Sequence, residues 1–292
     1  MSLQRFLMDK IDINHPPIIA VACAEDEEVI KAIDQLTNEN FVSAILIGDK
    51  SMINEMLKQQ QSVQTHRIID SPTKQESVMI AIDLIRRGQA NMLMKGQIDT
   101  SVILKAVLDK EKGLRKDSLL SHVSIAQLDD RTIVFSDGAM NIAPSIQHKQ
   151  TIIDQCCEVA DRLQLPFKHV GILCAVEKVS EKMPCTLDAI QLKHYVSKHH
   201  DAIIDGPFAL DNALSKKAAS IKNINSPIAG DVNILIMPNI EAGNVFYKTL
   251  TYIAKKEVAG IIMGAKVPII ITSRADDHQT KIHAILLACA CC

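Results

Sequence analysis

The chain has 292 residues, of which 47% are hydrophobic and 3% aromatic, and its formal net charge at pH 7 is −2. This near-neutral charge excludes the basic surface by which proteins bind nucleic acids or anionic membranes. The chain has no Trp, which disfavours a platform for stacking bases. The hydrophobic fraction excludes a disordered chain, so we expect a soluble protein with a sizeable core and room for two domains.

The first 17 residues, MSLQRFLMDKIDINHPP, contain no long apolar segment of the kind that a signal peptide carries. The most apolar stretch, Val258 to Thr272, is interrupted by Lys266 and is too short to cross a membrane. Eight cysteines occur without the spacing of a disulfide framework. His283 near Cys289 lacks the second pair of ligands that a zinc site needs. We therefore expect a cytoplasmic protein with reduced thiols, no metal and no membrane segment.

Short apolar runs rich in β-branched residues, each ended by turn residues, recur along the chain and predict strands. They cover Ile18–Ala24, Ala44–Ile47, Met92–Met94, Ile133–Phe135, Val170–Ala175, Ala202–Ile204, Ile234–Met237, Gly260–Met263 and Ile269–Thr272. Between most of them, apolar residues at i, i+3, i+4 and i+7 predict amphipathic helices. These helices cover Glu27–Leu36, Lys74–Ile85, Thr100–Leu108, Ile152–Leu163, Leu187–Val196 and Lys281–Ala288.

Strands that alternate with helices predict βαβ units and parallel sheets, and continuous apolar strands are typical of sheets covered on both faces. The number of strands exceeds what one open sheet usually holds. The fold class is therefore predicted as α/β, with two αβα lobes, mainly parallel sheets and a cleft between the lobes.

Several common motifs are missing. The chain has no G-x-G, no G-x-x-x-x-G-K-[ST], no H-E-x-x-H and no G-x-S-x-G. These absences disfavour a dinucleotide fingerprint, a P-loop, a zinc protease and a typical α/β-hydrolase. Because doubly wound folds bind ligands at the carboxyl ends of their strands, we expect the site in the loops that follow the apolar runs.

Two of these loops lie in the middle of the chain. In the first, a strand ends in Lys95-Gly96, where Gly allows close approach of the backbone and Lys supplies a point charge for an anion. In the second, Gly206-Pro207 breaks the chain after a strand, and Phe208 in the loop is predicted to line an apolar acyl pocket. The alternatives are an ordinary surface Lys and a purely structural turn.

The third loop joins a strand to a helix around Gly243 and Asn244. Free N–H groups at a helix start attract anions, and Lys248 lies one turn further on the same face. In the fourth loop a buried strand ends in Ser273-Arg274, whose hydroxyl and guanidinium suit a phosphate. The alternative is that Ser273 and Asp276 cap a helix.

Together these loops resemble those of the phosphate acyltransferases, in the same order. The matching segments are LMKGQIDTSVILKAVLDKEKGLR, SHVS, SDGAMNIAPSIQHK, AVEKVSEKMPCTLDA, IDGPFALDNALS, AGDVNILIMPNIEAGNVFYKTL and MGAKVPIIITSRAD. With the looser PPIIAVACAEDEEVIKAI, the resemblance covers essentially the whole chain, and the last two segments resemble the butyryl branch of the family.

The resemblance implies the reversible conversion of a short-chain acyl-CoA, with butyryl-CoA favoured, and phosphate to acyl phosphate and coenzyme A. It implies direct transfer in a ternary complex, coenzyme A as substrate, no tightly bound cofactor and a homo-oligomer of at least two chains. It also implies a fold like isocitrate and isopropylmalate dehydrogenase, with residues 1–133 plus 266–292 forming one domain and 134–265 the other.

By the same resemblance, Ser273 and Arg274 bind phosphate and the developing oxyanion. Acetyl enzymes place an Asp seven residues after the Ser, where this chain has Thr280, so the base does not carry over and Asp276 or Asp277 takes its place. Lys95, Asn244 and Lys248 are predicted substrate contacts.

Ser121 and His122, from the segment SHVS, are further predicted contacts of phosphate or substrate. A lone His is otherwise often structural.

Three alternative functions stay open on the sequence. One is acetyl transfer, because one methylene changes binding by only about 1–3 kcal/mol. The second is an oxidoreductase on the related fold, and the third is a protein that binds coenzyme A without turnover.

Overall fold

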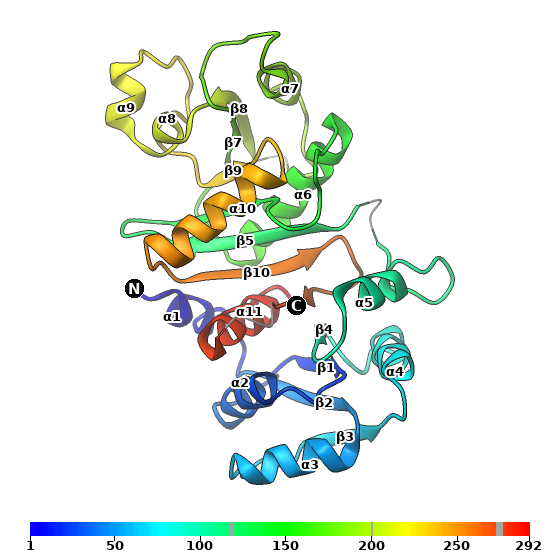
Figure 1. Ribbon diagram of the computed structural model, residues 1–292. Helices are drawn as coiled ribbons and strands as arrows, with labels where there is room; N and C mark the ends of the chain where they lie inside the picture. The colour runs from blue at the N-terminus through cyan, green and yellow to red at the C-terminus, as the bar shows by residue number, and fades with distance from the viewer. Residues whose placement is uncertain (117–118, 200, 273–276) are drawn as a thin grey trace. The chain divides into compact units, whose positions relative to one another are not determined.

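The computed structural model describes residues 1–116, 119–199, 201–272 and 277–292. The chain forms two compact units, unit 1 with Met1–Ser118 and Ala259–Cys292 and unit 2 with Leu119–Val258. In each unit helices cover a mainly parallel sheet (Figure 1). The predicted α/β class is confirmed. The predicted domain limits stay a prediction, because a compact region of the chain need not fold by itself.

Unit 1 has the strand order β3-β2-β1-β4-β11-β10. The strands are β1 (Ile18–Ala22), β2 (Ser43–Gly48), β3 (Arg67–Asp70), β4 (Met92–Lys95), β10 (Val258–Met263) and β11 (Ile269–Ile270). The helices are α1 (Leu3–Met8), α2 (Glu27–Asn38), α3 (Lys50–Gln59), α4 (Lys74–Arg86), α5 (Thr100–Val107) and α11 (His278–Ala290). The neighbours from β3 to β11 run parallel, and β10 is antiparallel to β11.

The apolar runs of unit 1 form its central strands because they bury side chains on both faces of the sheet. In β1, Ile19 to Ala22 are all fully buried, as are Met92 to Met94 in β4. The helices between the strands begin at polar N-caps, since Asp26, Asp49 and Thr73 each accept hydrogen bonds from the first turn.

Unit 2 has the strand order β5-β6-β9-β7-β8, with β5 antiparallel to β6 and the other neighbours parallel. The strands are β5 (Ser121–Gln127), β6 (Thr132–Ser136), β7 (His169–Leu173), β8 (Ile203–Phe208) and β9 (Ile234–Ile236). The helices are α6 (Ile146–Arg162), α7 (Pro184–Leu192), α8 (Leu210–Leu214), α9 (Lys216–Ile221), α10 (Ile240–Lys248) and the π-helical turn η1 (Thr249–Ile253).

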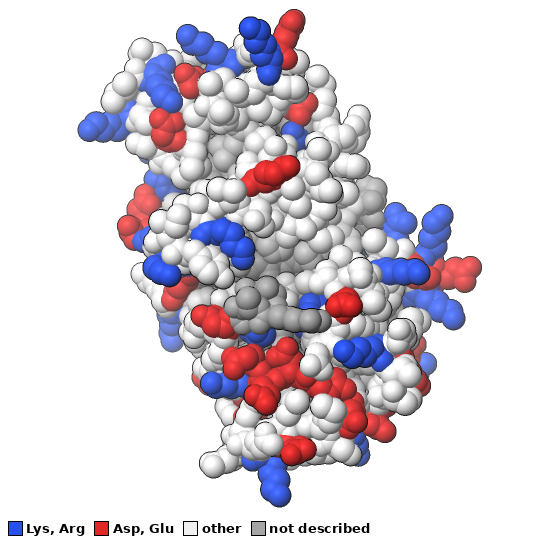
Figure 2. Space-filling view, viewed as in Figure 1, with Lys and Arg blue, Asp and Glu red and all other residues white. Residues whose placement is uncertain are grey.

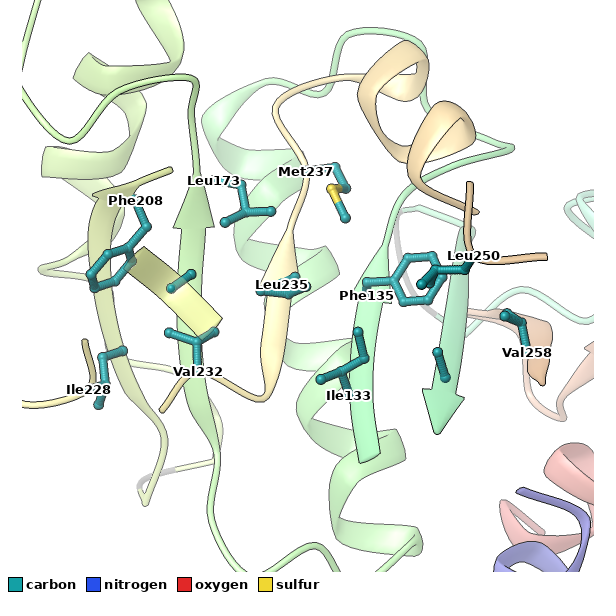
Figure 3. Packing of buried hydrophobic residues seen from close by; sticks show 12 residues of the cluster. Ile133, Phe135, Leu173, Phe208, Ile228, Val232, Leu235, Met237, Leu250 and Val258 are labelled. Atoms are coloured by element: carbon teal, nitrogen blue, oxygen red, sulfur yellow. The ribbon is translucent and has the colours of Figure 1, made fainter. Parts of the chain in front are cut away.

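The core of unit 2 lies between its sheet and the helices α8 and α10. Figure 3 shows Phe135, Leu235, Leu173 and Phe208 on successive strands, pointing to the same side of the sheet. The ring of Phe135 meets that of Phe246 edge-on, with centroids 5.1 Å apart. This packing fixes the strands of unit 2, and with them the loops that follow the strand ends.

All nine predicted strands and six predicted helices occur, although α6 begins at Ile146 rather than at the predicted Ile152. The structure adds the strands β3 and β5, which no apolar run predicts. Within the described ranges, no helix combines the length and the apolar character needed to cross a membrane.

Candidate active site

Lys95 ends β4 at the point where the strand order of unit 1 reverses, between β1 and β4. The side chain is buried, and its ammonium donates to the carbonyls of Gly96 and Ile98 at 3.2 and 3.1 Å. A Cβ on Gly96 would lie 2.0 Å from the Cys23 carbonyl oxygen, so only Gly fits where this loop meets the end of β1. Reversal points of this kind are where open α/β sheets bind ligands.

A cavity of about 460 Å³ opens beside this loop and is lined by Asp26, Lys74, Gly96 and Gln97. Lys74 is the first residue of α4, so its ammonium and the helix start both favour an anion there.

The neighbouring strand ends of unit 1 carry acidic side chains, which Figure 2 shows gathered around α2. Glu25 accepts from the Asp49 amide, and Asp70 accepts from the Lys50 amide at 3.0 Å. These carboxylates bind their own backbone and repel phosphate. Among the described strand ends of unit 1, the β4 end carries a lysine where its neighbours carry carboxylates.

Three predicted catalytic residues, Ser273, Arg274 and Asp276, lie outside the described residues. The strand before them, β11, pairs in parallel with β4, with Ile270 opposite Met94.

The helix after them, α11, begins at His278, and its N-cap is Asp277, which accepts from the Thr280 amide at 2.8 Å. This backbone hydrogen bond lowers the pKa of the Asp277 carboxyl. Asp277 is therefore engaged as a cap and is a weak base.

In unit 2, the start of β5 lies at the carboxyl end of β6, because the two strands are antiparallel. Ser121 is fully buried there, and its hydroxyl donates to the side-chain oxygen of Gln155 on α6. His122 is half-buried, with Nδ1 3.3 Å from the Ser124 hydroxyl and its ring centroid 6.0 Å from that of Tyr247. The Ser121 hydroxyl is thus used in a hydrogen bond within the fold, whereas the His122 ring faces Tyr247 on α10.

Asp137 follows β6 directly and is 2% exposed. Its carboxylate accepts from the amides of Ala139 and Met140 at 2.8 and 2.9 Å, from the His122 amide at 3.1 Å and from the Asn141 side chain at 2.6 Å. Sequence reasoning did not single out Asp137, although Asp-Gly after an apolar run is a visible signal of a strand-end loop.

The helix α10 begins against this same loop. Its N-cap, Asn239, accepts from the Ala242 amide, and the Asn244 side chain donates to the Gly138 carbonyl at 3.0 Å. A Cβ on Gly243 would lie 2.2 Å from the Asp137 carbonyl oxygen, so Gly is required for this approach. Lys248 is exposed on the same helix, 5.3 Å from the centroid of the Tyr247 ring.

Unit 2 therefore brings together three of the predicted contacts, His122, Asn244 and Lys248, around Tyr247 and the Asp137 loop. The prediction that Phe208 lies in a loop is wrong. Phe208 is the last residue of β8, 1% exposed, and belongs to the core. The reason is that β8 lies at the edge of the sheet, where Pro207 does not end the strand.

Five of the eight cysteines carry thiols that are poor nucleophiles. Burial raises the pKa of Cys23, Cys156, Cys174 and Cys289, and it raises the pKa of Cys157 to about 12. Because the thiolate is the nucleophile, these five are inert near neutral pH. The described part of the chain holds no group of three His, Cys, Asp or Glu residues that could bind a metal ion.

Comparison with known proteins gives the class of protein. Residues 56–289 match the family model described as phosphate acetyl/butaryl transferase. A probable phosphate butyryltransferase of Bacillus subtilis is 42% identical over 286 residues, which are 97% of this chain and 95% of that one. A phosphate acetyltransferase of Thermotoga maritima is 37% identical over 275 residues, 92% and 93% of the two chains.

Solved structures agree. A branched-chain phosphotransacylase of Enterococcus faecalis superposes with a TM-score of 0.83 at 30% identity, covering 94% of this chain and 98% of that one. A 4-hydroxythreonine-4-phosphate dehydrogenase of Burkholderia phymatum, with a TM-score of 0.56 at 11% identity and coverage of 95% and 99%, shares the fold alone. The chain belongs to the phosphate acetyl/butyryl transferase family and is a phosphotransacylase.

Proposed function

We propose that this phosphotransacylase acts on short-chain acyl-CoA, with butyryl-CoA favoured, and forms acyl phosphate and coenzyme A. The observation that carries the proposal is the 42% identity, over 97% of the chain, to a protein named as a probable phosphate butyryltransferase. Acetyl transfer is the second candidate, because a phosphate acetyltransferase is 37% identical over 92% of the chain.

In the proposed reaction, an oxygen of phosphate attacks the thioester carbonyl carbon. The new C–O bond forms, the C–S bond breaks, and the coenzyme A thiolate leaves and takes up a proton. Arg274 binds the phosphate through two parallel hydrogen bonds, and Ser273 donates to the phosphate or to the oxyanion that forms on the carbonyl. Asp276 exchanges the thiol proton, a role that Asp277 is less suited to because its carboxylate caps α11.

Contacts from the described residues support this assignment. The unit 2 cluster offers an imidazole at His122, an amide at Asn244 and a flexible cation at Lys248, which suit the phosphate groups and polar amides of coenzyme A. Lys95 adds positive charge at the end of β4. The raised pKa values of Cys156 and Cys157 disfavour an acyl-cysteine intermediate at those two residues.

The test is to incubate the purified protein with butyryl-CoA, with and without inorganic phosphate, and to separate the products by chromatography. A thiol reagent is unsuitable for detection because the chain has eight cysteines. We expect loss of the thioester only with phosphate, and formation of butyryl phosphate. Loss without phosphate would contradict the proposal and point to a thioesterase.

The acyl preference needs a panel of acetyl-, butyryl- and branched acyl-CoA at equal concentrations. A higher kcat/KM for butyryl-CoA supports the first candidate, and a higher value for acetyl-CoA supports the second. We also propose a homo-oligomer, and a mass in solution of at least two chains supports it.

A further inference from the structure

We propose that Asp137 is a positioning residue of this enzyme, whose carboxylate holds His122 in its working place. The inference rests on the proposed function, because it takes His122 as a substrate contact. Asp137 itself is 2% exposed, which suits support of a neighbour better than contact with a ligand.

The carboxylate of Asp137 is fully occupied by donors from two segments. One oxygen accepts from the amides of Ala139 and Met140, at 2.8 and 2.9 Å, and so closes the turn after β6. The other oxygen accepts from the His122 amide at 3.1 Å and from the Asn141 side chain at 2.6 Å. One buried charge thereby ties the head of β5 to the loop that follows β6.

Side chains also hold Ser121, the first residue of β5, and the two residues that precede it. Asn141 also donates to the Leu120 carbonyl at 2.9 Å, and Gln155 donates to the Leu119 carbonyl at 3.0 Å. Gln155 accepts from the Ser121 hydroxyl as well. Side chains from α6 and from the loop after β6 thus help to fix this segment, which is the expected arrangement where a functional side chain needs a precise place.

The same loop also carries the start of α10. The Gly138 carbonyl accepts from the Asn244 side chain at 3.0 Å, and the Asp137 carbonyl lies against Gly243. The ring of His122 faces Tyr247 on that helix at 6.0 Å. A shift of His122 therefore changes its position relative to the other substrate contacts that unit 2 provides.

The test is a double-mutant cycle of Asp137→Asn and His122→Ala. An Asn at 137 has one oxygen and one NH2 group where the carboxylate meets donors on both sides, so one pair of hydrogen bonds is lost in either orientation. A misplaced contact of this kind lowers kcat/KM by about 10- to 100-fold.

We expect each single variant to lower kcat/KM in this range, with the double variant within about 3-fold of His122→Ala alone. Losses that multiply in the double variant would overturn the inference. An unchanged kcat/KM in His122→Ala would overturn it too, while phosphate-dependent turnover still stood. Failure of the native protein to turn over acyl-CoA with phosphate is the separate failure of the proposed function.

The matched control is Asn233→Asp. Asn233 is 3% exposed and clamps the head of β7, donating to the Phe167 carbonyl at 2.7 Å and accepting from the His169 amide at 2.9 Å. It lies at the amino ends of the strands, away from the proposed site. We expect this variant to lower the melting temperature and leave kcat/KM unchanged, and an equal loss of kcat/KM would overturn the inference.

If Asp137→Asn does not fold, Asn141→Ala replaces it in the cycle. This variant removes the bonds to Leu120 and to one carboxylate oxygen, and leaves the Asp137 charge with its three amide donors. The expected result is the same: its effect on kcat/KM disappears in the His122→Ala background, and an effect that persists there contradicts the inference.

Discussion

At the scale of single residues, the proposed anion binding involves two lysines in different settings, Lys95 at the end of β4 and Lys248 on α10. Lys95 holds its ammonium against two carbonyls of its own loop, whereas Lys248 is exposed on α10. The first is suited to shaping the site and adding charge, and the second to contacting a mobile ligand. We therefore expect substitution of the buried Lys95 to affect stability more than substitution of the exposed Lys248.

Lys95→Met should destabilise the protein, because the carbonyls of Gly96 and Ile98 each lose a buried donor. An unpaired buried group costs about 1–3 kcal/mol, measurable by urea unfolding. We also expect a higher KM for phosphate. Lys105→Met, on an exposed position of α5, is the control and should change stability by less than about 0.5 kcal/mol. Equal stability of Lys95→Met and the control would contradict this reading of Lys95.

Arg274→Lys should raise the KM for phosphate by about 10-fold or more, because an ammonium cannot make the paired hydrogen bonds of a guanidinium. The KM for butyryl-CoA should change less. Arg87→Lys is the control, because Arg87 is exposed and pairs with Asp83 one turn earlier on the α4 surface, at 2.9 Å. An unchanged KM for phosphate in Arg274→Lys would remove Arg274 from the phosphate site.

At the scale of elements, the first turn of α10 is placed by contact of backbone with backbone. Gly243→Ala should force this helix away from the Asp137 loop, since the new Cβ would lie 2.2 Å from a carbonyl oxygen. We expect kcat/KM to fall by about 10-fold or more, as the contacts on α10 are displaced.

Gly88→Ala is the control for that substitution. Gly88 has φ +69° and nothing within 4 Å of the new Cβ, so this variant strains only its own backbone. A loss of stability of about 1 kcal/mol with full activity is expected. If both variants keep full activity, the placement of α10 does not matter for turnover.

Asp277→Ala should remove the N-cap of α11 and cost about 0.5–2 kcal/mol. In the folded protein the pKa of the Asp277 carboxyl is lower than its ordinary value of 3.8. The ionised carboxylate therefore stabilises the native state fully at pH values above 3.8. The stability difference between native and variant protein should therefore be full near pH 7 and shrink as pH falls through the folded pKa. A difference that stays constant down to about pH 2 would contradict the cap.

Element prediction from sequence succeeded where apolar runs are continuous and failed where burial depends on distant partners. The strand β5 contains Ser121, His122 and Gln127, yet most of it is buried because Gln155 and Asp137 satisfy its polar groups. The strand β3 is short, with exposed ends, so it has no apolar run to detect.

Part of the candidate site could be predicted from the sequence, because loops that follow strands are recognisable in it. Loops after strands gave Asn244 and Lys248, since strand order alone brings such loops to one edge. The sequence did not indicate the role of Asp137, because its partner His122 lies 15 residues away and on another strand. Phe208 was misplaced because Gly206-Pro207 has the pattern of a turn, whereas an edge strand tolerates Pro.

At the scale of the whole molecule, the chain returns to its first unit after completing the second. The helix α11 packs against α1 and α2, and nearly all of its residues are buried. The last helix therefore belongs to the core of unit 1, together with the first two helices of the chain. Ser273 and Arg274 stand in the sequence between β11 and α11, two elements of this returning segment.

The central claim for the whole enzyme is direct transfer of the acyl group from coenzyme A to phosphate. It belongs to the proposed function, and the raised pKa values of Cys156 and Cys157 bear on it only by disfavouring an acyl-cysteine at those two residues. An acyl-enzyme would instead release coenzyme A before phosphate binds and would show ping-pong kinetics.

The most direct test is exchange of isotopically labelled coenzyme A into butyryl-CoA, measured with the native enzyme in the absence and presence of phosphate. Direct transfer predicts no exchange without phosphate and rapid exchange once phosphate is added, because the label then returns through butyryl phosphate. Exchange at an equal rate without phosphate would show an acyl-enzyme and contradict the account.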